Sequence, residues 1–172
     1  SKMESGKLQL RKEPYSCIEL HDAVCAMMEP LCREKNITFY TNLNPQNDII
    51  FTDKTKLNRI FFNLLGNAVK FTPAGGTVSV RVRQFAGTVR DCAQYEFRVR
   101  DNGIGIEDNI KAKIFEPFFT TKPTAEAAGV GLYLCREVIL NHQGSIIVKS
   151  EKDNFTEFMI TIPIYQKSNN NE

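Results

Sequence analysis

The sequence predicts one α/β domain, folded as a two-layer sandwich in which about three helices cover one face of a mixed, largely antiparallel sheet. Its length of 172 residues suits a single domain with a sizeable core. Three segments have the apolar spacing or the boundary signals of helices. Six shorter segments have strand patterns, two of them with strict alternation of apolar and polar residues.

The first helix is expected from Ser16 to about Arg33. Ser16 and Glu19 form a capping box. Five apolar residues then recur at helical spacing: Leu20, Val24, Met27, Met28 and Leu31. Two short strands, Ile37–Thr41 and Ile49–Phe51, are expected after this helix, with a loop between them.

The second helix is expected from Asp53 to Phe71. Six apolar residues form a continuous stripe along it: Leu57, Ile60, Phe61, Leu64, Leu65 and Ala68. Pro73 and the pair Gly75-Gly76 end it.

Four strands and a third helix complete the predicted fold: strands Val78–Val82, Tyr95–Val99, Ser145–Ser150 and Phe158–Ile164, and helix Gly129–His142. A hairpin loop is expected at 87–94. The stretch 101–128 is irregular, and a loop of that length inside a compact domain is usually functional. The tail 166–172 is polar, which predicts disorder.

Composition excludes several classes of protein. The formal net charge is +2 with Lys and Arg scattered, so no basic footprint for nucleic acid is present. No apolar run approaches the roughly 20 residues of a membrane span, so no direct membrane contact is expected. The five cysteines lack a C-x-x-C spacing, which favours reduced thiols and a cytoplasmic location.

A polar stripe of the second helix is the first candidate site. Asn63, Asn67 and Lys70 are spaced i, i+4, i+7, and their stripe lies roughly 120° from the apolar one. Asn is a poor helix former, so two of them in mid-helix suggest a function. Amide oxygens suit Mg²⁺, and Lys70 could contact a phosphate. The alternative, which spacing alone leaves open, is a solvated polar flank.

Two glycine-bearing segments could bind a ligand. The turn Asp101-Asn102-Gly103-Ile104-Gly105-Ile106 follows a strand, so its carboxylate could accept a hydrogen bond from an amino group, and its glycines allow close approach to a flat ring. Gly129-Val130-Gly131-Leu132 begins the third helix, where N–H groups can bind phosphate. Purely structural turns and caps explain either segment as well. No Rossmann or P-loop pattern is present.

Aromatic residues cluster in the long irregular loop. Phe115, Phe118 and Phe119 lie beside Thr120, Thr121 and Lys122. They could fix the loop over a ligand or form a small satellite core under it. The sequence alone leaves both readings open.

The order of these motifs resembles the catalytic and ATP-binding domain of two-component sensor histidine kinases, which has the Bergerat ATP-binding fold also found in gyrase, chaperone and mismatch-repair ATPases. The resemblance covers Ser1 to about Ile164. It implies that the chain binds Mg²⁺ and ATP. The implied activity is transfer of the γ-phosphate to a histidine of a dimerisation domain in the same protein, with a response regulator receiver domain as the second partner.

The resemblance also implies roles for individual residues. Segment 63–73 is similar to the family's N box, in which Asn67 is the main Mg²⁺ ligand, Asn63 assists it, and Lys70 faces the phosphates beside Phe71. Asp101 would bond the adenine amino group. The other implied ATP-binding residues are Gly103, Gly105, Ile106, Phe115, Thr120, Thr121, Lys122, Gly129, Val130, Gly131 and Leu132. The segment of about 107–128 corresponds to a mobile ATP lid.

Two features depart from a complete kinase. Ala127 stands where the family has the first glycine of the box that ends at Gly131. The sequence also lacks the H-E-x-R-T-P context of a phosphoacceptor, which neither His21 nor His142 provides. We therefore expect residues 1–12 to be the end of a dimerisation hairpin, 13–165 the catalytic domain, and 166–172 a disordered tail or linker.

Three other functions remain as alternatives. A clamp-type ATPase would carry a general-base Glu where this sequence has Asn63, which cannot act as a base. A serine kinase of the anti-sigma type shares the nucleotide motifs, although the hairpin-like beginning argues against it. A degenerate module that only binds nucleotide or transmits conformation is supported by Ala127 alone.

Overall fold

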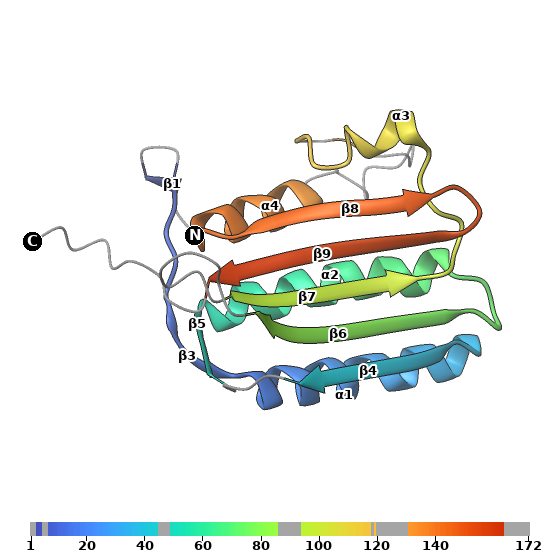
Figure 1. Ribbon diagram of the computed structural model, residues 1–172, viewed down its shortest axis with the longest axis horizontal. Helices are drawn as coiled ribbons and strands as arrows, with labels where there is room; N and C mark the ends of the chain where they lie inside the picture. The colour runs from blue at the N-terminus through green and yellow to red at the C-terminus, as the bar shows by residue number, and fades with distance from the viewer. Residues whose placement is uncertain are drawn as a thin grey trace, which may run out of the picture.

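A five-stranded sheet forms one layer of the fold, and helices cover one of its faces (Figure 1). The computed structural model describes residues 3–4, 7–44, 49–85, 94–117, 119 and 131–163. Across the sheet the strands are β4 (Thr38–Asn44), β6 (Thr77–Phe85), β7 (Gln94–Asp101), β9 (Phe155–Pro163) and β8 (Ser145–Glu151). Strand β4 is parallel to β6 and the other neighbours are antiparallel, so the predicted mixed, largely antiparallel sheet is confirmed.

Helix α1 (Cys17–Lys35) covers the β4 edge of the sheet. Ser16 caps its beginning, because its hydroxyl accepts hydrogen bonds from the N–H groups of Ile18 and Glu19. Asn36 ends it in the left-handed conformation, with φ of 60°. The helix therefore extends two residues beyond the predicted end at Arg33.

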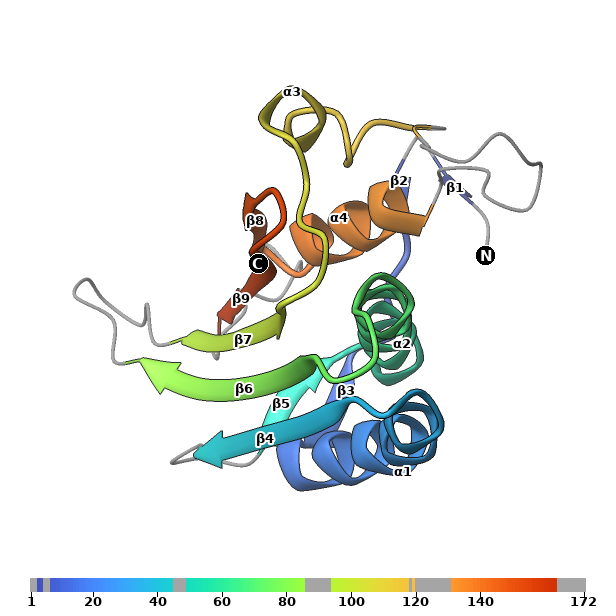
Figure 2. The ribbon, with the colours of Figure 1, turned by 90° about the vertical axis from the view of Figure 1, so that its right-hand side faces the viewer.

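Helix α2 (Lys54–Phe71) contacts both α1 and α4 (Gly131–Asn141), and the turned view shows all three on the same face of the sheet (Figure 2). Its buried residues are those of the predicted stripe: Leu57, Ile60, Phe61, Leu64, Leu65 and Ala68. Phe61 packs edge to face on Phe97 of β7, with 5.2 Å between ring centroids. The apolar stripe thus fixes which flank of α2 stays available for a ligand.

Several short elements were not predicted. Strand β3 (Glu13–Ser16) pairs with β5 (Ile49–Thr52), and β1 (Met3–Glu4) pairs with β2 (Lys7–Leu8). The four-residue helix α3 (Asp108–Lys111) lies in the stretch that was expected to be irregular. The predicted hairpin loop and tail lie outside the described residues, except that Gln94 already belongs to β7.

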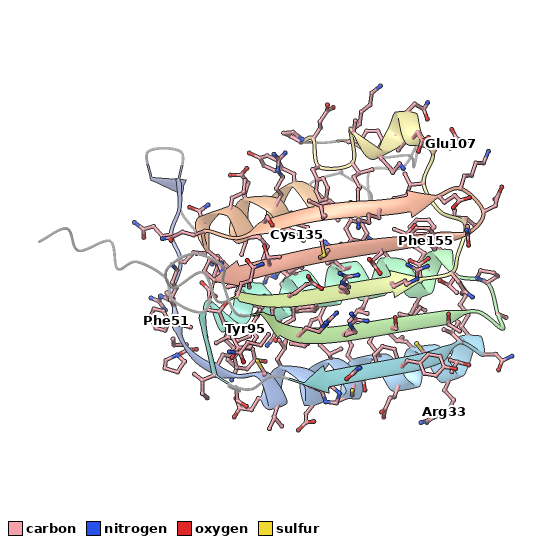
Figure 3. All side chains as sticks on the ribbon, viewed as in Figure 1. Arg33, Phe51, Tyr95, Glu107, Cys135 and Phe155 are labelled. Atoms are coloured by element: carbon pink, nitrogen blue, oxygen red, sulfur yellow. The ribbon has the colours of Figure 1, made fainter. Side chains whose placement is uncertain are left out.

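The sheet face opposite the helices is polar and ion-paired. Arg98 bonds both Glu96 and Glu157, and Arg100 also bonds Glu157. The guanidinium of Arg100 lies 4.2 Å from the ring centroid of Phe155, which Figure 3 labels at the start of β9. Among the described residues, no helix is both long and apolar enough to cross a membrane.

Candidate functional site

The predicted polar stripe lies on the half-buried flank of α2. The side-chain amide of Asn67 donates a hydrogen bond to Oδ1 of Asn63, over 3.2 Å. This bond orients the Asn67 amide, and its own oxygen accepts no hydrogen bond from any described residue. An oriented amide oxygen without a protein donor is a suitable ligand for a hard cation. The described residues contain no cluster of three or more His, Cys, Asp or Glu that could hold a metal instead.

The beginning of α4 meets this stripe. A Cβ atom added to Gly131 would lie 2.5 Å from Nδ2 of Asn63, so any larger residue here would require the Asn63 side chain to shift. In the part of the chain that the structure describes, α4 begins at Gly131, so the positive end of its helix dipole lies at this contact. The amide pair of α2 and the positive end of α4 are therefore adjacent.

The last turn of α2 brings two further predicted residues to the site. Lys70 and Phe71 are both exposed, and Nζ of Lys70 lies 5.6 Å from the Phe71 ring centroid. Lys70 is one turn beyond Asn67 on the same flank, so its charge is available to an anion that reaches Asn67.

Asp101 ends β7 with a buried carboxylate. Its side chain is 8% exposed, and Oδ1 accepts a hydrogen bond from the N–H of Gly103 over 2.9 Å. Burial raises the pKa of Asp101, because it disfavours the charged form. Its other oxygen accepts no hydrogen bond from the described residues, so the site fits a ligand that offers an amino group.

The backbone conformation and close packing at position 105 require glycine. Gly105 has φ of +68°, and a Cβ atom there would lie 2.1 Å from the carbonyl oxygen of Glu151. The next N–H, that of Ile106, donates to the hydroxyl of Ser150 over 2.8 Å. The close approach of this loop to the end of β8 therefore explains Gly105 without a ligand.

The described part of the lid is packed against the sheet. Lys111 of α3 donates to the Ser150 carbonyl over 2.9 Å, and Ile114 is buried. Phe115 packs edge to face on Phe158, with 6.2 Å between centroids. Phe115 thus anchors the base of the lid, and its contact with a nucleotide stays a prediction. Leu132 packs against the core.

Five other predicted ATP-binding residues lie outside the described residues: Thr120, Thr121 and Lys122 of the lid, and Gly129 and Val130. The same holds for Ala127, so the effect of that departure on the lid stays open to test. No structural role is assigned to these six positions.

Two hydroxyl residues near the site were missed by the sequence analysis. Thr156 of β9 is the register partner of Asp101, is buried, and lies 3.0 Å from the Ser150 hydroxyl. Thr72, which follows α2, is fully buried, and its hydroxyl has no hydrogen-bond partner among the described residues. The position of Thr156 beside Asp101 depends on the pairing of β7 with β9, which no local sequence pattern indicates.

The chain is similar to sensor kinases along most of its length. It is 34% identical over 171 residues to the autoinducer 2 sensor kinase/phosphatase LuxQ of Vibrio harveyi. The aligned region covers 95% of this chain and 20% of that relative. The chain therefore spans about a fifth of the length of such curated relatives.

Solved structures share the fold. The catalytic domain of histidine kinase ThkA superposes with a TM-score of 0.76 at 26% identity, covering 90% of this chain and 97% of that one. Full-length ShkA in complex with AMPPNP superposes with a TM-score of 0.77 at 28% identity, covering 94% and 33%. ThkA has also been solved in complex with the response regulator protein TrrA, with a TM-score of 0.73 at 26% identity and coverage of 90% and 42%.

The family assignment rests on a match over two thirds of the chain. Residues 52–166 match the family described as histidine kinase-, DNA gyrase B- and HSP90-like ATPases. This range begins two residues before α2 and contains the asparagine pair, the segment 101–106 (the Asp101 loop) and the start of α4. The two-layer fold and the placement of these residues agree with that match, and the chain belongs to the histidine kinase-, DNA gyrase B- and HSP90-like ATPase family.

Proposed function

We propose that this chain binds Mg-ATP and transfers the γ-phosphoryl group to a histidine of a dimerisation domain, as part of a two-component sensor kinase. One observation supports this most: the Asn63–Asn67 pair touches the start of α4, while the Asp101 loop packs at the end of the same helix α2. A ligand with an amino-bearing ring at one end and phosphates at the other fits this arrangement.

Each part of the nucleotide would meet a different group. Asp101 would accept a hydrogen bond from the adenine amino group, and Lys70 and the start of α4 would face the phosphates. Asn67, held by Asn63, would be the main protein ligand of Mg²⁺. The bound ion would neutralise phosphate charge during transfer.

The reaction needs little covalent chemistry from this chain. A histidine nitrogen of the acceptor would form a bond to the γ-phosphorus with its lone pair, while the bond from that phosphorus to the bridging oxygen breaks and ADP leaves. The proton on the other imidazole nitrogen would pass to solvent. His142 cannot be the acceptor without unfolding, because it is fully buried.

The clamp-ATPase alternative is disfavoured by Asn63. Hydrolysis of that type requires a carboxylate base at this position, whereas the Asn63 amide accepts a hydrogen bond from Asn67 and contacts Gly131. The arrangement of Asn63 favours positioning of ATP over activation of water.

Partners and boundaries are part of the proposal. LuxQ is named a sensor kinase/phosphatase, and ThkA was solved with a response regulator, which supports a receiver domain as the second partner. We infer that 1–12 leads from a dimerisation hairpin, that 13–165 is the catalytic domain, and that 166–172 is a linker or tail.

The test is phosphate transfer between separate chains. The chain is mixed with labelled ATP and with the dimerisation hairpin of its own protein. Acid-labile, base-stable label on the hairpin is expected, at a slow rate because the local concentration that tethering gives is lost. Acid-stable, base-labile label on serine would favour the anti-sigma type of kinase. Robust ATP hydrolysis without any labelled protein would favour the clamp ATPase.

A further inference from the structure

Three different donors form hydrogen bonds with the last four backbone carbonyls of α2. The last four carbonyls of a helix have no helical donor and need other partners. The Ala68 carbonyl accepts from the N–H of Thr72 over 3.1 Å, and the Phe71 carbonyl accepts from the N–H of Ile104 over 3.3 Å. Thr72 follows the helix directly, whereas Ile104 belongs to the Asp101 loop. The last carbonyl of α2 therefore holds the loop that carries Asp101.

The two remaining carbonyls share one ammonium group. Nζ of Lys35 donates to the carbonyl of Val69 over 2.7 Å and to that of Lys70 over 3.0 Å. Lys35 is the last residue of α1 and is half-buried. A positive charge at the C-terminal end of a helix is favoured by the helix dipole, and charge-assisted hydrogen bonds are roughly twice as strong as neutral ones.

A second contact holds the same end of the fold. The Asn36 carbonyl, next to Lys35, accepts from the N–H of Gly75 over 2.7 Å, in the turn that follows α2. The end of α1 thus fixes both the last turn of α2 and the turn after it. That last turn carries Lys70 and supports the Asp101 loop through Phe71.

We propose that Lys35 is a positioning residue for nucleotide binding, acting through the last turn of α2 on Lys70 and on the Asp101 loop. The inference rests on the proposed function, because it assumes that these two groups bind the two ends of ATP. Lys35 itself touches neither group's side chain in any described hydrogen bond. Its effect is therefore to hold the spacing between the phosphate-facing and adenine-facing parts of the site.

The test compares nucleotide affinity with global stability. Lys35→Met keeps the aliphatic stem and removes both donated bonds. We expect the dissociation constant for Mg-AMPPNP, measured by calorimetry on the folded chain at low temperature, to rise about tenfold, the size of one lost charge-assisted bond. Amide hydrogen exchange at Ile104 should accelerate more than exchange at buried β7 amides such as that of Phe97, which report on global unfolding.

Arg33 provides the matched control. It lies two residues earlier in the same turn, is exposed, and points away from the fold into solvent (Figure 3). Arg33→Met removes the same formal charge from the end of α1 and should leave both readouts unchanged. Lys35→Arg should restore most of the affinity because a guanidinium can donate to the same carbonyls. If Lys35→Met does not fold, Lys35→Gln gives the same comparison, with a loss of roughly threefold from its weaker neutral donor.

The outcomes separate the two proposals. Failure of the wild-type chain to bind Mg-AMPPNP would overturn the proposed function. Binding by the wild type with an unchanged dissociation constant in the Lys35 variants, or an equal loss in Arg33→Met, would overturn the role of Lys35 alone. A loss confined to the Lys35→Met and Lys35→Gln variants, recovered in Lys35→Arg and accompanied by faster Ile104 exchange, would support it.

Discussion

The imidazole of His142 accepts a hydrogen bond at Nε2 from the backbone N–H of Asp53, over 3.1 Å, and so joins the end of α4 to the beginning of α2. The Thr52 hydroxyl lies 2.8 Å from the same nitrogen, and Nδ1 lies 2.8 Å from the Val138 carbonyl. Nδ1 therefore carries the proton, and the ring is neutral. Asp53 also caps α2 and accepts a bond from the N–H of Arg11. The two helices that carry the candidate site are thus tied together at the end of α4 opposite to Gly131.

This contact predicts a pH dependence of stability. Burial lowers the pKa of His142 below its usual 6.5, since it disfavours the imidazolium. The neutral ring then stabilises the fold fully above about pH 6.5, and this contribution falls as pH drops from 6.5 toward the lowered pKa. Urea unfolding at a series of pH values should show that the difference in free energy of unfolding between the wild type and His142→Gln shrinks across that interval. A constant difference between the two proteins from pH 7.5 to 5 would contradict the neutral-ring assignment.

Asp101 should make the site selective for adenine. GTP presents a carbonyl where ATP has an amino group, so two acceptors would face each other, at a cost of about 1–3 kcal/mol. Competition binding should therefore rank ATP above GTP by roughly five- to 150-fold. Asp101→Asn, whose amide can donate or accept, should narrow that ratio, whereas Asp108→Asn at an exposed position should not. Equal affinities in the wild type would show that Asp101 is only a structural cap.

Alanine substitution at two glycines near the site should affect two different properties, nucleotide affinity and stability. Gly131→Ala places a methyl group against Nδ2 of Asn63 and should weaken nucleotide binding by disturbing the Asn63–Asn67 pair. Gly66→Ala meets no atom within 4 Å in the interior of α2, and should raise the free energy of unfolding by up to about 1 kcal/mol. Calorimetry and urea unfolding distinguish the two effects. Normal affinity in Gly131→Ala would mean that the start of α4 moves away from Asn63 when ligand binds.

The placement of the candidate site residues could be predicted because their signals are local, whereas their roles stay predictions. Asn63 and Asn67 contradict helix propensity within one turn, and Asp101 follows a strand and precedes glycine, so a short window contains the pattern. The apolar stripe of α2 fixed the flank on which Asn67 lies, and the structure confirms that stripe.

The supporting contacts could not be predicted because they join distant segments. Lys35 reaches Val69 across 34 positions, and His142 reaches Asp53 across 89, so no local pattern records either bond. Strand β3 is four residues long and depends on pairing with β5. Helix α3 is too short to form without the lid contacts around it.

The metal dependence of nucleotide binding is the sharpest test of whether Asn67 holds Mg²⁺ in this site. Calorimetry with a non-hydrolysable ATP analogue is performed with and without Mg²⁺ on the wild type, Asn67→Ala and Asn58→Ala. Asn58 is the matched control, because it lies on the same helix but is held by the Tyr15 hydroxyl at 2.8 Å, so its loss should cost stability of about 1 kcal/mol and leave the metal effect intact. We expect Mg²⁺ to strengthen binding to the wild type and to Asn58→Ala, and to have little effect on binding to Asn67→Ala. Equal metal dependence in all three proteins would contradict the assignment of Asn67 as the Mg²⁺ ligand.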